Sequence, residues 1–170
     1  MDLVINLAGL AEDSIVDGPG IRVALFAQGC PRRCAGCHNP QTHAFGVGED
    51  FSVEQLYQVI RKNPLAKGVT FSGGEPFAQA EAFLPLAEKL RSDGYELAAY
   101  SGYTFDQLYS GTPAQQQLLS LMNVLIDGEF VLAQKNLDLR WRGSANQRIL
   151  DVPQSLLQGV AVLSADPRWQ

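Results

Sequence analysis

The hydrophobic pattern of this chain alternates short, largely apolar runs with stretches of helical periodicity. Apolar residues on both faces of a run are typical of strands that are covered on both sides in a parallel sheet. Four such runs predict strands at residues 21–27, 68–71, 95–101 and 123–127, and a fifth strand is expected at 147–152.

Helical signals fill the intervals between these runs. Ser52 with Gln55, and Thr104 with Gln107, have the spacing of a capping box, in which each side chain bonds the other residue's backbone N–H at a helix start. A further helix is predicted at 79–92. The alternation of strands and helices predicts an α/β fold with a mainly parallel sheet.

The length of 170 residues indicates a single domain. We expect its core from about residue 15 to 152 and a tail at 153–170. Four or five strands are too few to close an eight-stranded barrel, so a partial, laterally open (βα) barrel is predicted. In such folds the loops beyond the carboxyl ends of the strands carry the chemistry.

Composition narrows the range of partners. The chain has 13 Lys and Arg against 18 Asp and Glu, a formal net charge of -5, which argues against a nucleic-acid surface. No apolar run approaches a membrane span, and the first residues lack the basic start of a signal peptide. We therefore expect a cytoplasmic protein with no membrane partner.

Three cysteines, Cys30, Cys34 and Cys37, lie within eight residues. In a reducing compartment such a group indicates a metal site or reactive thiols rather than a disulfide scaffold. A four-iron cluster with one open iron fits three thiolates. Zinc would need a fourth ligand, such as His38 or His43, and a redox dithiol would leave Cys30 without a role.

Charged residues near this loop give two further expectations. Arg32 and Arg33 lie between the cysteines, and their charge is expected to lower the thiol pKa. Arg22 lies inside a predicted strand, where a cation needs a partner; a salt bridge with Asp17 or Glu75 and a contact with a cofactor are the two alternatives.

Four segments occur together in the order DGPGIRVALFAQGCPRRCAGCHNPQTH, TFSGGEP, NVLIDGEF and WRGSANQR. The cysteine spacing resembles that of the radical S-adenosylmethionine superfamily. The flanking segments are similar to those of the glycyl-radical-enzyme activases that act on anaerobic ribonucleotide reductase. The resemblance extends from about residue 17 to residue 151.

This resemblance implies a function. Cys30, Cys34 and Cys37 would hold a [4Fe-4S] cluster whose open iron is chelated by S-adenosylmethionine. One electron would cleave that molecule to methionine and a 5′-deoxyadenosyl radical, which removes a hydrogen atom from a glycine Cα of the partner. The implied partners are the glycyl radical subunit of anaerobic ribonucleotide reductase and a flavodoxin-like or ferredoxin-like electron donor.

The glycine-rich turn implies further cofactor contacts. In the superfamily this turn receives the methionine amino group, so Gly73 and Gly74 would let the backbone approach the ligand. Glu75 would accept a charge-assisted hydrogen bond from the amino group. An ordinary strand-to-helix turn is the simpler interpretation of the same residues.

Other contacts are implied at the ends of the predicted strands. Backbone around Gly36, Cys37 and His38 is expected next to the adenine. Ser101 is a candidate for the methionine carboxylate or the ribose, and Asp127 for the ribose. Ser-Gly and Asp-Gly pairs are also common turn formers after strands.

The segment WRGSANQR places Arg140, Arg142 and Arg148 around a Gly-Ser turn. The resemblance implies that it lies near the open side of the barrel and helps to seat the partner's glycine loop. A solvated basic segment is the alternative.

Two other functions remain open at the level of the sequence. The first is activation of a different glycyl radical enzyme of the formate-lyase type, although those activases are longer and lack the RGSxNQR segment. The second is a non-catalytic zinc or iron–sulfur scaffold protein.

Overall fold

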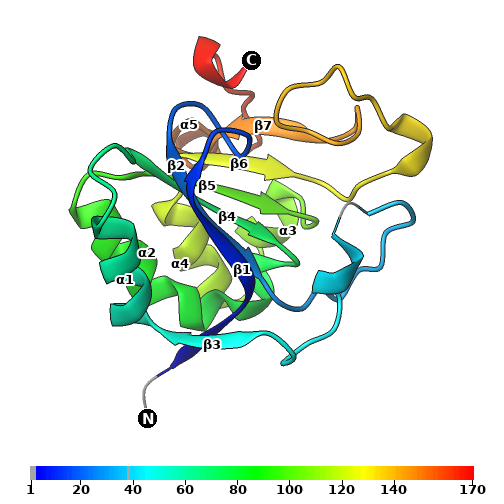
Figure 1. Cartoon of the computed structure of the whole chain (residues 1–170). Coiled ribbons are helices and arrows are strands. Elements are labelled where there is room, and N and C mark those ends of the chain that lie inside the picture. Colours follow the sequence, from blue (N-terminus) through cyan, green and yellow to red (C-terminus); the bar gives the residue numbers. More distant parts are fainter. Residues whose placement is uncertain (1–2, 38) are drawn as a thin grey trace.

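The computed structural model describes residues 3–37 and 39–170 and contains a seven-stranded sheet with the order β3-β1-β2-β4-β5-β6-β7 (Figure 1). The strands are β1 (Val4–Ser14), β2 (Arg22–Ala27), β3 (Glu49–Ser52), β4 (Gly68–Gly73), β5 (Glu96–Ser101), β6 (Val124–Asp127) and β7 (Arg148–Asp151). The four central strands β2, β4, β5 and β6 run parallel, while β1 and β7 pair antiparallel with their neighbours. The predicted α/β class is confirmed, and the sheet is open.

The helices are α1 (Val53–Arg61), α2 (Ala80–Ser92), α3 (Phe105–Tyr109), α4 (Pro113–Leu121) and α5 (Val152–Gln158). Both predicted capping boxes form, at Ser52 and at Thr104, and a third, which was not predicted, starts α4 at Thr112. Among the described residues, no helix has the length and apolar character that a membrane crossing requires.

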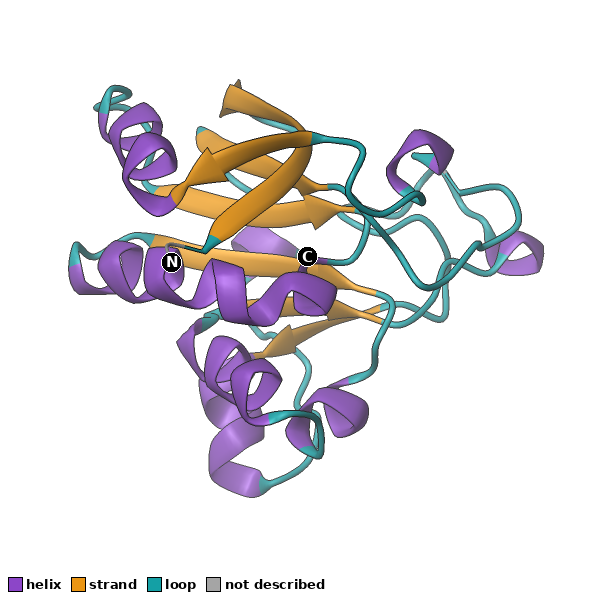
Figure 2. Ribbon diagram, turned by 90° about the horizontal axis from the view of Figure 1, so that it is seen from below, coloured by secondary structure: helices purple, strands orange, loops and turns teal. Residues whose placement is uncertain are grey.

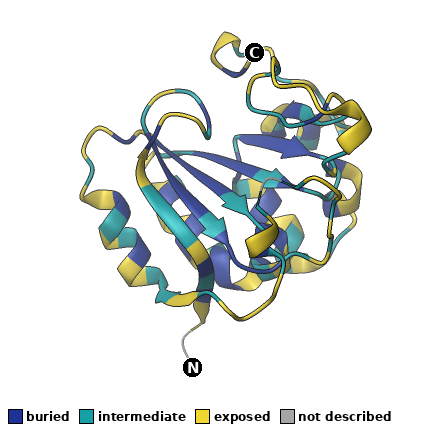
Figure 3. Cartoon of the chain, turned by 45° about the vertical axis from the view of Figure 1, so that its right-hand side comes forward, coloured by how far each residue is buried: buried dark blue, intermediate teal, exposed yellow. Residues whose placement is uncertain are grey.

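One large core cluster fills the space between the sheet and the helices. It joins alternate strand residues, such as Val23, Leu25, Val69 and Phe71, to side chains from all five α-helices. These strand positions share one face because successive side chains point to opposite sides of a strand. Figure 3 shows this buried centre, surrounded by exposed loops.

The opposite face of the sheet carries a second, smaller buried cluster. A small cluster of Ala98, Val124, Ile126 and Ile149 packs there against Trp169, which belongs to the short 3-10 helix Pro167–Trp169. The C-terminal turn and the loop that contains Trp141 thus cover this face of the sheet. The loops that follow the parallel strands project beyond one end of the sheet (Figure 2).

Two strands were not predicted. In β1 only Ile5, Leu7 and Ser14 are buried, and its Ala, Gly, Glu and Asp residues carry little strand preference. β1 pairs with β2 and β3 on its two sides, so both strands are specified by partners distant in sequence. The sheet therefore starts before residue 15, and the tail reaches back into the fold through Trp169.

Candidate functional site

The loop after β2 carries the three cysteines and is fixed at both ends. Gly29 N donates to Thr42 O at 2.7 Å, and Cys30 N donates to His43 O at 3.1 Å. Within the loop, Cys37 N donates to Cys34 O at 3.1 Å. All three thiols are free and partly exposed, so they are available as ligands.

Gly36 sits where the cysteine loop packs against another loop. Its φ is +74°, and a Cβ at this position would come within 2.7 Å of Leu132. This close packing explains why a glycine occupies position 36 without any contact to adenine. The predicted adenine contact of Gly36 stays a prediction. His38 lies outside the described residues.

The glycine-rich turn at the end of β4 is hydrogen-bonded through its backbone to the start of the cysteine loop. Gly74 N donates to Ala27 O, and Glu75 N donates to Gly29 O, both at 2.8 Å. A Cβ on Gly73 would lie 2.5 Å from Ala27 N, and one on Gly74 would lie 2.4 Å from Gly29 O. The two glycines are therefore required by the approach of the neighbouring backbone, whatever ligand the turn receives.

Glu75 is completely buried and holds three segments together. Its carboxylate accepts hydrogen bonds from Ser101 Oγ at 2.8 Å, Gly102 N at 2.8 Å and Phe77 N at 3.2 Å. Burial raises the pKa of this carboxyl, against the effect of these donors and of Arg32. The predicted contact of Glu75 with an amino group stays a prediction, since the carboxylate already has an internal role.

Arg32 is held in place by Glu129 and Tyr103. Its Nε lies 2.6 Å from Glu129 Oε1, and its guanidinium stacks 4.0 Å from the ring of Tyr103. Arg32 acts to lower the pKa of Cys30 and Cys34, as expected, but burial outweighs it and raises the pKa of both thiols. Arg32 Nη1 is buried without a hydrogen-bond partner and lies 3.6 Å from Glu75.

A cavity of about 360 Å³ brings these elements together. This volume is typical of a small-molecule site. The predicted site residues that line it are Cys30, Cys34, Cys37, Gly73, Gly74, Glu75 and Ser101. Gly36 and Asp127 are not among its lining residues.

Asp127 is buried beside a separate hollow. Its carboxylate accepts two hydrogen bonds from Arg148, at 3.0 and 2.6 Å, and one from Phe105 N at 2.8 Å. These contacts give Asp127 an internal partner, and the predicted ribose contact stays a prediction.

Arg22 is paired differently from the expectation. Its Nη1 lies 2.7 Å from Glu96 Oε1 rather than near a carboxylate of Asp17 or Glu75. Its Nε donates to Thr70 Oγ1 at 2.9 Å. The expected partners Asp17 and Glu75 were wrong. Glu96 belongs to β5, which is separated from β2 by β4, so its closeness to Arg22 depends on the strand order of the sheet.

The segment WRGSANQR is mostly folded inward rather than solvated. Gln147 Oε1 accepts from Gly143 N at 2.8 Å and Ser144 N at 3.1 Å, and its Nε2 donates to Gly128 O. Trp141 and Arg142 line the cavity. The polar residues of the motif thus serve to fix a loop against the end of β6.

Some cavity residues were not predicted as site residues. Ser72 and Tyr100 line the cavity from the ends of β4 and β5. Burial raises the pKa of the Tyr100 phenol. Alternation along each strand, which puts every second residue on the same face, is the signal that identifies them.

The donor set of this cavity fits an iron–sulfur cluster with a small charged ligand. Three free thiols match the cysteine ligands of such clusters. Arg32 Nη1, which is buried and makes no hydrogen bond, offers a donor to an anionic group. Within residues 3–37 and 39–170, no three His, Cys, Asp or Glu side chains gather tightly enough around one point for a single metal ion.

Comparison with known proteins agrees with this chemistry. The family described as a 4Fe-4S single cluster domain matches residues 16–150. The anaerobic ribonucleoside-triphosphate reductase-activating protein of Escherichia coli (strain K12) is 37% identical over 143 residues, which cover 78% of this chain and 90% of that protein. The proteins of the same name from Vibrio cholerae and from Enterobacteria phage T4 are 36% and 34% identical, with 79% of this chain covered in both cases and 90% and 86% of theirs.

Among solved structures, QueE from Escherichia coli aligns with a TM-score of 0.46 and 21% identity. The alignment covers 75% of this chain and 71% of QueE, and a likeness of this degree carries no weight for function. The sequence relatives carry the assignment: this chain belongs to the family of anaerobic ribonucleoside-triphosphate reductase-activating proteins and contains its 4Fe-4S single cluster domain.

Proposed function

We propose that this protein is a radical S-adenosylmethionine activase that generates a glycyl radical on anaerobic ribonucleotide reductase. The observation that carries the proposal is the meeting, at one cavity, of three free thiols with the turn that contains Gly73, Gly74 and Glu75. These groups lie on loops after two neighbouring parallel strands, β2 and β4. Membership of the activating-protein family supports the same reaction.

Cys30, Cys34 and Cys37 would hold the [4Fe-4S] cluster and leave one iron for the amino and carboxylate groups of S-adenosylmethionine. When bound and reduced, the cluster supplies one electron to the S–C5′ bond, which yields methionine and a 5′-deoxyadenosyl radical that takes a hydrogen atom from a glycine Cα. The chain itself binds, orients and shields these groups.

Different residues around the cavity would bind and orient the cofactor. The turn backbone at Gly73 and Gly74 would lie against the methionine half, with Glu75 and Ser101 holding the turn in place. Arg32 Nη1, buried and without a hydrogen-bond partner, is suited to the methionine carboxylate. Tyr103 supports Arg32 through its ring, so the guanidinium does not need to be ordered on ligand binding.

We propose the glycyl radical subunit of anaerobic ribonucleotide reductase as the protein substrate and a flavodoxin-like or ferredoxin-like protein as the electron donor. The partial exposure of the three thiols supports electron entry from outside. A cytoplasmic location is proposed with these partners, since thiol ligands require a reducing compartment.

The test is electron paramagnetic resonance of the anaerobically reconstituted protein mixed with reductase, reductant and S-adenosylmethionine. A glycyl doublet is expected, with about four irons per chain and production of 5′-deoxyadenosine. The Cys34→Ala variant should give neither product. One zinc per chain without cofactor cleavage would replace this proposal by a scaffold role, and cleavage without a doublet would point to a different glycyl radical enzyme.

A further inference from the structure

The C-terminal tail that follows α5 folds back onto the sheet and ends in the 3-10 helix Pro167–Trp169. It is fixed along β7, where Ser164 N donates to Ile149 O at 2.9 Å. Arg168 Nη2 lies 2.6 Å from Glu96 Oε2 at the start of β5. The family match ends before α5 begins, so this anchored tail lies beyond the segment that matches the 4Fe-4S single cluster domain.

Trp169 is the tail residue that enters the fold, and it is almost completely buried. Its ring lies edge-on against Trp141, with 5.9 Å between the centroids, a favourable arrangement for two aromatic rings. The Arg22 guanidinium lies 5.3 Å from the ring centroid, and a Cβ on Gly18 would come within 2.8 Å of the ring. The indole Nε1 is buried and makes no hydrogen bond to any described residue. Trp169 therefore contributes through its ring rather than through a polar contact.

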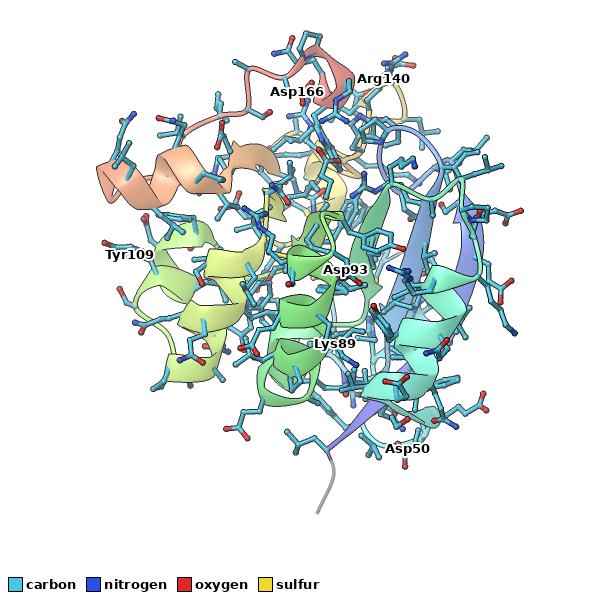
Figure 4. All side chains as sticks on the ribbon, turned by 90° about the vertical axis from the view of Figure 1, so that its left-hand side faces the viewer. Asp50, Lys89, Asp93, Tyr109, Arg140 and Asp166 are labelled. Carbon is cyan, nitrogen blue, oxygen red and sulfur yellow. The ribbon has the colours of Figure 1, made fainter. Side chains whose placement is uncertain are left out.

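Trp141 lines the cysteine cavity and has a costly backbone conformation. Among the described residues it is the one non-glycine residue with a positive φ, +63°, and such a conformation persists only where surrounding contacts enforce it. The tail supplies such contacts, because the Trp141 ring packs on Trp169 and Arg140 Nη1 lies 3.4 Å from Gln170 O. Figure 4 shows Arg140 at the same edge of the molecule as Asp166, which belongs to the tail.

Other parts of the cavity wall also rest on Trp169 and its neighbours. Tyr100 lines the cavity and packs against the small buried cluster to which Trp169 belongs. Asp17 lines the cavity from the turn between β1 and β2, directly before Gly18, which the Trp169 ring contacts. Trp169 itself is not among the lining residues. It lies behind the wall, so any effect on a bound molecule must act through the residues that it supports.

We propose that Trp169 is a positioning residue of the cofactor cavity: it holds Trp141 in the wall of the cavity that binds S-adenosylmethionine. The C-terminal tail is then part of the cofactor site, although it lies beyond the family match. Without the Trp169 ring, Trp141 leaves its costly conformation in a fraction of the molecules, and the apparent affinity for the cofactor falls with the fraction that keeps the wall intact. This inference rests on the proposed function.

The test compares Trp169→Leu with the conservative variant Trp169→Phe and with the matched control Phe83→Leu. Trp169→Leu keeps an apolar side chain, so the fold should be retained, whereas Trp169→Phe keeps an aromatic ring and loses an N–H that makes no hydrogen bond. Phe83 is equally buried and also pairs with an aromatic ring, that of Phe71 at 5.0 Å, but it lies in the core cluster between the sheet and the helices.

Two measurements are made on these variants. Calorimetric titration of S-adenosylmethionine into the anaerobically reconstituted, unreduced proteins should give a Kd that rises roughly fivefold in Trp169→Leu and stays within about twofold of wild type in Trp169→Phe and Phe83→Leu. At saturating S-adenosylmethionine the glycyl radical yield of Trp169→Leu should equal that of wild type, since the reacting atoms are untouched. The second measurement uses cluster-free protein. Trp141 is the sole tryptophan of both Trp169 variants, and acrylamide should quench its fluorescence more strongly in Trp169→Leu than in Trp169→Phe.

Three results would overturn this inference and leave the proposed function intact. The first is an unchanged Kd for S-adenosylmethionine in Trp169→Leu. The second is an equal rise in Kd in Phe83→Leu, because the effect would then come from a general loss of stability. The third is equal quenching of Trp141 in the two Trp169 variants. Failure of the wild-type protein, with its cluster loaded, to bind and cleave S-adenosylmethionine would instead refute the proposed function.

Discussion

The ion pair between Asp127 and Arg148 yields a prediction in which the two partners are unequal. The Asp127 side chain is 1% exposed, whereas that of Arg148 is 39% exposed. The carboxylate accepts two hydrogen bonds from the guanidinium and one from Phe105 N. Removing the cation therefore leaves a buried charge, while removing the anion leaves a charge that water can reach.

The magnitudes follow from this difference. Arg148→Met leaves the Asp127 carboxylate with Phe105 N as its remaining hydrogen-bond donor, and breaking a buried pair in this way costs about 3–5 kcal/mol of unfolding free energy. Asp127→Asn keeps one amide oxygen as acceptor and loses part of the bidentate contact. A lost hydrogen bond to a charged group costs about 1.5–3 kcal/mol. Arg148→Met is thus expected to be the more destabilising substitution.

The assay is urea unfolding of the reduced, cluster-free protein at pH 7, followed by circular dichroism. The double variant Asp127→Asn/Arg148→Met should lose at least about 1 kcal/mol less than the sum of the single losses, because the two residues are coupled. Equal losses in the two single variants, or strict additivity in the double variant, would refute the reasoning from burial.

Three further predictions concern the cavity. Gly74→Ala should cost about 1–3 kcal/mol in urea unfolding, since its Cβ would lie 2.4 Å from Gly29 O, whereas Gly9→Ala, with no atom within 4 Å, should cost less than about 0.5 kcal/mol. Burial raises the pKa of Cys30 and Cys34. In the cluster-free protein, the rate of their alkylation by iodoacetamide should therefore reach half its maximum at a pH above the ordinary thiol pKa of about 8.5. A half-maximal rate at a lower pH would contradict the effect of burial. Cys34→Ala should lose most of the bound iron after reconstitution, measured by metal analysis, and full iron binding would remove this residue from the ligand set.

Much of the fold followed from signals that span only a few residues. The capping boxes at Ser52 and Thr104 formed as predicted, because both partners of each box lie three positions apart in one turn. The central strands were found because their apolar runs are continuous. By contrast, β1 was missed although its first half is largely apolar, and β3, which has Phe51 as its one apolar residue, is a strand because it pairs with β1.

The sequence by itself determined that three thiols share one loop, and that a glycine-rich turn follows a parallel strand of the same sheet. The tertiary structure decided what each polar side chain meets. Glu75 accepts from Ser101, and Arg22 pairs with Glu96, which is 74 residues away. Trp169 packs against Trp141, a cavity residue, from a tail that gave no signal in the sequence. The physical reason is that such contacts depend on strand order and loop packing, which no local pattern encodes.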